Sequence, residues 1–402
     1  MATIKINKSE IKRLEAFASF VKSASTMAEF SEKHAFVLDE KLKKLEVYAE
    51  AAPCSGAYGL VEIRLDLVEA TATNLVYFIL SSAAFAGAAN KVSGDVVTIS
   101  VDERRENRLT FAGSDRSRVS LSPNVQRDWD EIKEMTTRIE KVKNHMKDKV
   151  VVPANHPMLA DLLKLSAMAK ALDHIGDVEV TADAVKAADE LCIVSISRQT
   201  GLKDTMYINR DFIQIMKDAG DVVFFGNDYR QAIFDVPNKG ISAYVQFGSI
   251  EYDFPTDDEL RSFLPDDSDF VTIEVATADL FKTLVAFDGI FDNASWRFKQ
   301  VRIKFDRAEI TKTGEGEVFY DDLKAECHQY LKMKVLEDKS ALASFSFVLS
   351  TTHLTGALKS LLEENDNLIL RINGLGSSAA KHNRGILLET SRARIILPKM
   401  ME

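Results

Sequence analysis

The sequence predicts an α+β protein made of three tandem copies of one plan, in which two helices pack on antiparallel strands. Helices and strands follow the same order three times, and similar strands recur at matching places in that order. GDVVTIS, GDVVFFG and DNLILRI each follow the second helix of a copy, while DRSRVSLSP and TSRARIILP each close a copy with a strand ending in proline. Each copy has about 120 to 140 residues, the size of a domain and not of a solenoid turn. The alternative is an ordinary α/β chain without internal repetition.

The first copy begins with an amphipathic helix at Ser9. A second, nearly all-apolar helix is predicted over 73–86, followed by strands at 94–101 and 108–123. The last of these is typical of a hairpin whose turn is Gly113-Ser114-Asp115. Helical spacing in the first helix is shown by Ile11, Leu14, Ala18 and Val21.

The second copy repeats this order. Its first helix starts near Pro157, because proline is tolerated in the first turn of a helix. Asn209 is a good N-cap for its second helix. Strands are predicted at 220–227, 229–236 and 241–255.

The third copy starts with a helix at about Thr277. A long strand follows at 297–305, and Thr351 or Thr352 caps the second helix. The final strands are predicted at 366–373 and 385–398.

One segment falls outside the repeat. Residues 124–150 contain a highly charged helix, so the three domains are expected at 1–123, 151–268 and 269–402. The helix is interpreted as a surface linker, and a partner-docking or DNA-proximal element is the alternative because its end is basic. Its apolar stripe has a spacing near 3.5 residues and consists of Trp129, Ile132, Met135, Ile139, Val142 and Met146.

Composition limits the class of protein. No apolar run approaches the roughly 20 residues of a membrane span, and the N-terminus lacks a secretory h-region. The 3 cysteines lie far apart, which suits a reducing cytoplasm and not a disulfide framework or zinc site. The net charge of −10 disfavours a broad basic surface for nucleic acid, but it allows DNA to be held in a locally basic channel.

No catalytic motif is found. The sequence has no Gly-rich phosphate loop, no GxSxG, no HExxH and no histidine pair at metal-ligand spacing, so we expect neither an enzyme nor a cofactor or metal. An acidic cluster is interpreted as a solvated connector, with a cation or enzyme site as the alternative. It comprises Asp257, Asp258, Glu259, Asp266, Asp267 and Asp269.

Basic residues occur on the predicted helices, away from their apolar stripes. If the helices of all copies lined one surface, that surface would be positive and could hold phosphates without reading bases. For any one lysine, a solvated helix face is the plainer interpretation. The candidate DNA-facing residues are Lys12, Arg13, Lys164, Lys170, Arg210, Lys217, Lys282 and Lys359.

Three motifs resemble the bacterial DNA polymerase III beta subunit, the β sliding clamp family. SDRSRVSLSP (114–123) resembles the strand that closes the clamp's first domain, and FPTDDELRSFLP (254–265) resembles the end of its second. The segment from TTHLTGALKS to RARIILPKMM resembles its final helix, hairpin and tail. The resemblance covers nearly the whole chain and implies three clamp domains in a head-to-tail homodimeric ring around duplex DNA. It also implies sequence-independent sliding, and tethering of a replicative polymerase and a clamp loader through short peptides.

The resemblance implies two further sites. The ring-closing interface joins a first-domain edge strand with Val119 and Leu121 to a third-domain segment with Ile290 and Phe291, although all four would also suit an ordinary core. A peptide pocket between domains two and three is implied at Ile175, Gly201, Pro255, Phe263, Ile395, Leu397, Pro398 and Lys399.

The chain departs from the family pattern at the pocket. ISRQTG (196–201) replaces a TDGHR-like run, LPKMME replaces a proline followed by an apolar residue, and Asp161 and Asp218 interrupt the basic helices. A divergent clamp with its own polymerase, of cellular or phage origin, would account for these changes. The alternative is a clamp-fold scaffold or decoy that binds partners without encircling DNA.

Overall fold

A computed structural model gives the structure of the chain. It describes residues 2–24, 33–51, 58–72, 76–102, 108–123, 129–144, 146–171, 177–188, 192–226, 229–246, 264, 268–291, 300–322, 325–340, 343–361, 367–373 and 385–397. The chain divides into two compact units, each with its own core. Unit 1 contains residues 1–159 and 206–249, and unit 2 contains residues 160–205 and 250–402.

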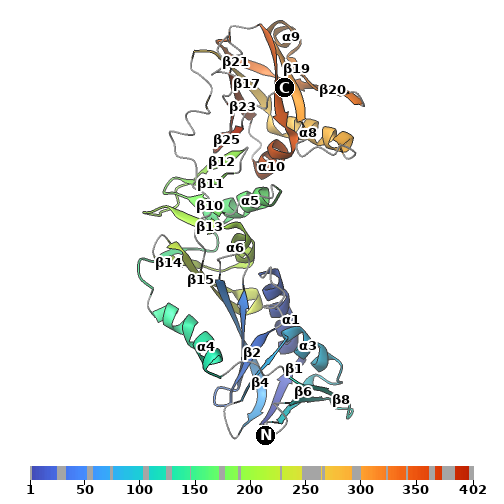
Figure 1. Cartoon of the computed structure of the whole chain (residues 1–402), viewed down its shortest axis with the longest axis vertical. Coiled ribbons are helices and arrows are strands. Elements are labelled where there is room, and N and C mark those ends of the chain that lie inside the picture. The colour runs from blue at the N-terminus through green and yellow to red at the C-terminus, as the bar shows by residue number, and fades with distance from the viewer. Residues whose placement is uncertain are drawn as a thin grey trace. The chain divides into compact units, whose positions relative to one another are not determined.

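Unit 1 is built on one long antiparallel sheet (Figure 1). Its strands run in the order β8-β7-β6-β1-β4-β16-β15-β14-β9, and β2, β3 and β5 extend it beside β4. The bounds are β1 Ala2–Asn7, β2 His34–Asp39, β3 Lys44–Ala51, β4 Tyr58–Thr71, β5 Tyr77–Leu80, β6 Val96–Asp102, β7 Arg108–Ala112, β8 Arg118–Leu121, β9 Val150–Val152, β14 Val222–Phe225, β15 Gln231–Val236 and β16 Ile241–Gln246.

The strand β4 joins two parts of this sheet. Residues 67–71 of β4 pair with β1, residues 59–66 pair with β3, and residues 58–63 pair with β16 on the other side. A register shift between Lys5 and Ile6 of β1 leaves one extra residue in β4 at Val68, which is 47% exposed. The β4–β16 pairing connects strands of the first copy to strands that follow residue 220.

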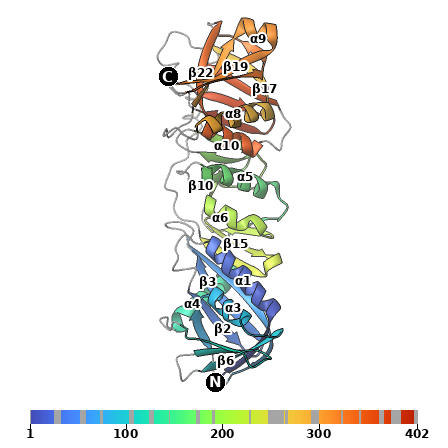
Figure 2. The same ribbon diagram turned by 90° about the vertical axis from the view of Figure 1, so that its right-hand side faces the viewer.

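Helices cover both faces of the unit 1 sheet. Helix α1 (Lys8–Ser23) and helix α3 (Ser82–Asn90) lie on one face, while α4 (Trp129–Asn144) lies on the other (Figures 1 and 2). The remaining short helices are α6 (Arg210–Ile215), η2 (Met216–Asp218) and η4 (Pro237–Lys239), and the strand β13 (Met206–Asn209) precedes α6.

Helix α1 forms because its apolar residues fall on one stripe. Ile11, Leu14 and Phe17 are fully buried, and Phe20 and Val21 continue the stripe. Aromatic rings fill the core between α3 and the sheet: Phe36 stacks on Phe78 and Phe85 at centroid distances of 4.8 and 5.0 Å. The buried stripe on α1 fixes which side of that helix faces outward.

The predicted extent of the second helix of the first copy, residues 73–86, is wrong. Residues 77–80 form the strand β5, which pairs with β2, and the helix starts only at Ser82. A continuous apolar run suits a buried strand as well as a buried helix, so periodicity does not separate the two. The hairpin predicted at 108–123 is confirmed as β7 and β8.

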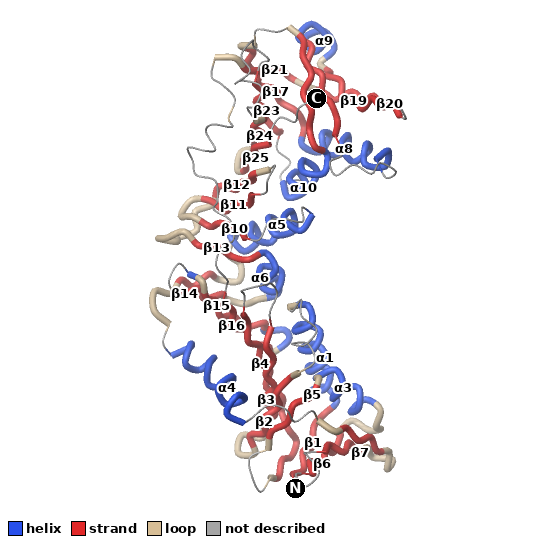
Figure 3. Tube along the Cα trace, viewed as in Figure 1, coloured by secondary structure: helices blue, strands red, loops and turns tan. Residues whose placement is uncertain are grey.

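Unit 2 contains a second long sheet and a smaller one (Figure 3). Within the unit, the long sheet runs β10-β11-β12-β25-β24-β23-β17-β21, and the small sheet runs β20-β19-β18-β22. The bounds are β10 Asp177–Val180, β11 Ala184–Ala188, β12 Ile193–Ser197, β17 Phe270–Ala276, β18 Gln300–Asp306, β19 Glu315–Asp322, β20 Ala325–Lys332, β21 Lys334–Asp338, β22 Ser344–Ser350, β23 Asn367–Asn373, β24 Ile386–Glu389 and β25 Ala393–Leu397.

Helices α8 (Thr277–Phe291) and α10 (Thr351–Leu361) pack together in unit 2. Leu280, Leu284 and Phe287 of α8 are fully buried, as are Leu354 and Leu358 of α10. Helix α5 (Pro157–Ala171) starts in unit 1, and its residues from 160 onward belong to unit 2. The three-domain division remains a prediction beside these two units.

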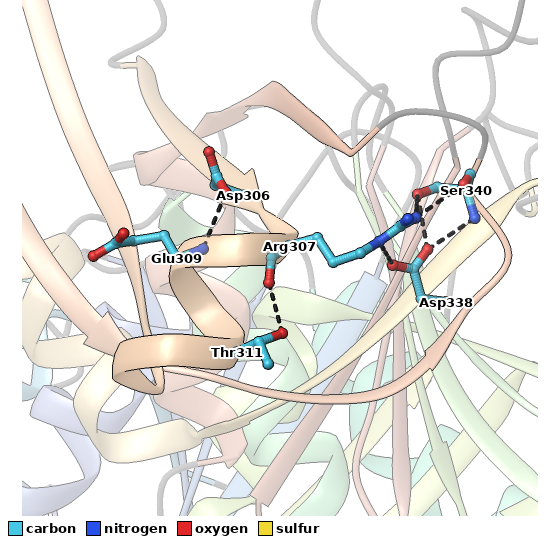
Figure 4. A network of polar contacts seen from close by, with 6 residues as sticks. All are labelled: Asp306, Arg307, Glu309, Thr311, Asp338 and Ser340. Atoms are coloured by element: carbon cyan, nitrogen blue, oxygen red, sulfur yellow. Dashed lines mark hydrogen bonds and ion pairs between the residues drawn. The ribbon is translucent and has the colours of Figure 1, made fainter.

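A polar network links helix α9 (Arg307–Thr313) to Asp338 and Ser340 in unit 2 (Figure 4). Asp306 caps α9 by accepting from the backbone N–H of Glu309 at 3.1 Å. Arg307 Nε donates to Asp338 Oδ2 at 2.5 Å and its Nη2 donates to the Ser340 carbonyl at 3.1 Å. Burial alone would raise the pKa of Asp338, but hydrogen bonds from Arg307 and Ser340 outweigh burial and lower that pKa.

This network predicts a pH dependence of stability. Because the pKa of Asp338 is lower in the folded chain than in an unfolded one, its ionised form stabilises the fold above about pH 4. That stabilisation is lost as the pH falls through the lowered pKa. We expect Asp338→Asn to lower the urea midpoint at pH 7 and to match the wild type more closely as the pH approaches 3. Glu337→Gln, at an exposed neighbouring carboxylate, is the control, and a pH-independent difference for Asp338→Asn would contradict this assignment.

Candidate DNA-facing helices, interface edges and peptide pocket

The candidate DNA-facing residues differ in exposure. Lys12, Lys217, Lys282 and Lys359 are exposed, and Lys164 is half-buried. The side chains of Lys170 and Arg210 lie outside the described residues. The exposed lysines therefore stand on α1, η2, α8 and α10.

Arg13 has a local structural role. Its Nη1 donates to Glu10 Oε2 at 2.6 Å, and the same Glu10 oxygen accepts from the backbone N–H of Asp66 at 3.0 Å. The guanidinium also packs over Gly240, where a Cβ would collide with it and where φ is +63°. Arg13 thus fastens α1 to β4 and to the residue that follows η4.

The two acidic residues on the basic helices, Asp161 and Asp218, are each paired with a basic side chain. Asp161 of α5 is buried and binds Arg198 Nε at 2.5 Å. Asp218 is exposed, but Lys239 Nζ lies 3.0 Å from its Oδ2. The basic character of the helix faces is therefore interrupted less than the sequence alone indicates.

The edge strand β8 is held by its turn. Asp115 accepts from the backbone N–H of Ser117 at 2.9 Å, and its own N–H donates to Ser93 Oγ at 3.1 Å. Hydrogen bonds from Ser117 and Ser93 lower the pKa of Asp115 to about 2. Val119 and Leu121 are half-buried on β8, at the end of the unit 1 sheet.

A second edge strand, β20, borders the small sheet of unit 2. Tyr330 is 66% exposed there, and His328 Nδ1 lies 2.6 Å from Glu317 Oε1. The sequence did not predict this edge, although polar and apolar residues alternate in its first half, along AECH. Ile290 and Phe291 form the last turn of α8, and their side chains lie outside the described residues.

The segment that departs from the family pattern is firmly held in unit 2. The Thr200 N–H donates to the Ala182 carbonyl at 3.0 Å, and Thr200 Oγ1 donates to the Thr181 carbonyl at 2.6 Å. The Arg198 N–H donates to the Asp183 carbonyl at 2.7 Å. Gly201 follows at φ +76°, exposed and with open space where a Cβ would lie.

A comparison with solved structures covers the whole chain. The DNA polymerase III beta chain of Streptococcus pneumoniae matches with a TM-score of 0.69 at 13% identity, with 100% of each chain covered. The sliding clamp of Bacillus subtilis gives 0.68 at 13% identity, also with 100% of each chain covered. The beta subunit of Thermotoga maritima gives 0.63 at 8% identity with the same coverage. This is the fold of the bacterial β sliding clamp.

Sequence comparisons add nothing to this likeness. A search with protein-family models and a search of curated proteins both find no match. The clamp fold is therefore detected through structure at identities of 8 to 13%.

Within this clamp fold, the candidate pocket is described only in part. Ile395 and Leu397 lie in β25 and are buried, and β25 pairs with β12. Of the three candidates that the structure describes, Gly201 is exposed. The remaining candidates, Ile175, Pro255, Phe263, Pro398 and Lys399, lie outside the described residues, so the pocket stays a prediction.

The acidic cluster falls almost wholly outside the described residues, and only Asp269 is placed, where it is buried. Among the described residues, no group of three or more His, Cys, Asp or Glu side chains could hold a metal ion. In the same part of the chain, no helix has the length and apolar character needed to span a membrane.

Proposed function

We propose that this protein is a DNA polymerase processivity factor that acts as a homodimeric ring around duplex DNA. The observation that carries the proposal is the clamp fold over the whole chain. Exposed lysines on α1, η2, α8 and α10 support a phosphate-facing surface. A ring holds DNA by enclosure, so a few sequence-independent contacts are enough, and the net charge of −10 over the whole chain is compatible with sliding. No catalytic step is part of this function.

Ring closure requires two chains in this proposal. Three clamp domains at 1–123, 151–268 and 269–402, with 124–150 as an added linker, give six domains in a dimer. The edge strand β8 of one chain, with Val119 and Leu121, would meet the end of α8 and the edge strand β20 of the other. Both strands lie at sheet ends in the described part of the chain. Exposed edge strands favour pairing with another chain.

The ring would tether a replicative polymerase and a clamp loader through short peptides. An apolar groove near Gly201 and β25 would accept the apolar anchors of such a peptide. Tethering raises the effective concentration of the polymerase at the primer end. The firm hold on residues 198–200 supports a preformed groove wall.

Retention on circular and linear plasmids tests the enclosure. After loading, we expect the protein to stay on nicked circles through gel filtration at 0.5 M salt, the order of ionic strength at which phosphate contacts weaken. Cutting the circle once should release it, because an enclosing ring slides off an end. Equal retention on circles and linear DNA would contradict enclosure and favour ordinary binding. No retention on either, with a stable fold, would favour the scaffold or decoy alternative.

Removing residues 398–402 should abolish binding of partner peptides while leaving the dimer intact. The predicted pocket includes Pro398 and Lys399, so the deletion removes one of its walls. Fluorescence anisotropy with a labelled apolar peptide, selected for binding to the full-length protein, measures the loss. Removing only Met401 and Glu402 is the matched control and should retain affinity. An unchanged affinity in the longer deletion would place the pocket elsewhere.

A further inference from the structure

An apolar row crosses the outer face of the unit 1 sheet. The strand register places Val151, Val223, Ile233, Tyr244 and Leu60 side by side on five neighbouring strands, β9, β14, β15, β16 and β4. The row therefore crosses the β4–β16 pairing. This face is opposite the one that carries α1 and α3 (Figure 1).

Helix α4 covers the part of this row formed by Leu60, Tyr244 and Ile233, whereas Val151 at its end is 51% exposed. Ile132 is fully buried in a cluster that contains Leu60 and Tyr48 on one side of the β4–β16 pairing, and Ile233 and Tyr244 on the other. Val142 and Met146, toward the end of the same segment, pack against that cluster. The helix thus contacts strands of both parts of the sheet at once. It lies on the face opposite α1 and α3, so it would lie away from DNA if those two helices face DNA as proposed.

Polar groups surround the covered cluster. Tyr244 Oη donates to Gln231 Oε1 at 3.3 Å, and Tyr48 Oη donates to Glu46 Oε2 at 2.8 Å. Beyond the helix, the Gly226 N–H donates to the Lys147 carbonyl at 3.4 Å. The chain then continues into β9, which pairs with β14. Both the tyrosine hydroxyls and the backbone are therefore satisfied with α4 in place.

The long sheet of unit 2 shows that such a row need not be apolar. On one face of that sheet, a row runs across Glu179, Lys186, Ser195, Arg394, Glu389, Ile369, Glu274 and Lys334. Ion pairs link its members, with Lys186 3.0 Å from Glu179 and Arg394 2.9 Å from Glu389. A polar row can face water, whereas the apolar row of unit 1 needs a cover. The apolar residues of α4 therefore match the apolar row on which they pack.

The backbone pairing beneath α4 joins a strand of the first copy to a strand of the second. β4 and β16 join through six residue pairs, from Ile241 opposite Ile63 to Gln246 opposite Tyr58. Gly59 lies within this stretch and adds no side chain to it. Packing by α4 therefore adds side-chain contacts on both sides of a pairing that backbone hydrogen bonds also hold.

We propose that α4 is a brace that locks the β4–β16 pairing, so that the strands of the first copy and the unit 1 strands of the second copy (β9, β14, β15 and β16) move as one body. The contacts of Ile132, Val142 and Met146 with the sheet support the brace. Its consequence for a ring rests on the proposed function. In such a ring, opening would occur at the interface between chains or at another junction, and not at β4–β16.

Hydrogen exchange of the full chain, without DNA, tests the brace. In Ile132→Asp, a charge replaces the fully buried apolar contact of α4, and amides of residues 58–63 and 241–246 should exchange about tenfold faster than in the wild type. Amides of β1 and β6, which pair away from α4, should stay within about twofold. Glu134→Ala, at an exposed position of the same helix, is the matched control and should change neither region. Ile132→Ala is the milder variant if the aspartate variant does not fold.

Each result decides the proposal. Faster exchange confined to the β4–β16 strands supports the brace. No change at those strands overturns it, and so does an equal acceleration at β1 and β6, because α4 would then stabilise the whole unit and not the junction. For the ring, Ile132→Asp should shorten retention on circular plasmids. If the wild type shows no retention on circles, the proposed function fails while the exchange result still decides the brace.

Discussion

Replacing Ile290 and Phe291 together with aspartate is expected to convert the proposed dimer to a monomer. Both residues form the last turn of α8, at the segment proposed to meet β8 of a second chain. If these positions lie in the proposed interface, two charges desolvated there without partners should raise the dimer dissociation constant by at least about 100-fold. Analytical ultracentrifugation at micromolar concentration measures the change, and the variant should also lose its retention on circular DNA.

Val285→Asp is the matched control for that experiment. Val285 lies on the same helix and is 43% exposed, so a charge there adds little desolvation. It should remain dimeric. If the double variant also remains dimeric, the interface does not include the end of α8. Val119→Glu on β8 examines the opposite edge independently, and it should dissociate the dimer as well.

Arg198→Met is expected to lower the free energy of unfolding by about 3 kcal/mol, because it leaves the buried Asp161 carboxylate without its cation. Urea denaturation followed by circular dichroism measures this loss. Arg198 also donates its backbone N–H to Asp183, a bond that the substitution keeps. The effect therefore reports on the side-chain pair.

The double variant Asp161→Leu with Arg198→Met separates the pair from simple packing. Replacing both charges by apolar side chains removes the uncompensated carboxylate, so most of the lost stability should return. Lys203→Met, at an exposed site in the same segment, should be nearly neutral. If the double variant is as unstable as Arg198→Met, the ion pair does not explain the loss.

Local pattern predicted some elements of this fold and misplaced others. Helix α1 has a clear 3.6-residue stripe, and it forms where that stripe lies. The run at 77–80 has no period and became β5, paired with β2. A signal for the true helix start was present, since Ser81 caps α3 by accepting from the Ala84 N–H at 3.4 Å.

The candidate sites depended on contacts that spacing does not encode. Asp161 and Arg198 are 37 residues apart, and each was noted separately as a departure from the clamp pattern. Only the fold brings them together. Likewise, the stripe on α4 predicted a helix with one apolar side, but the position of that side on the sheet depends on Ile132 meeting strands from both copies.

The dual pairing of β4 has a consequence for how this gene can change in length. One end of β4 pairs with β1 while the other pairs with β16, and alternate residues point to opposite faces. Deleting a single codon between residues 63 and 67 would turn every side chain on one half of the strand inside out relative to the other half. The protruding residue at Val68 is the place where β4 already absorbs one extra residue. Insertions and deletions should therefore accumulate in the connections between strands and be purged from β4.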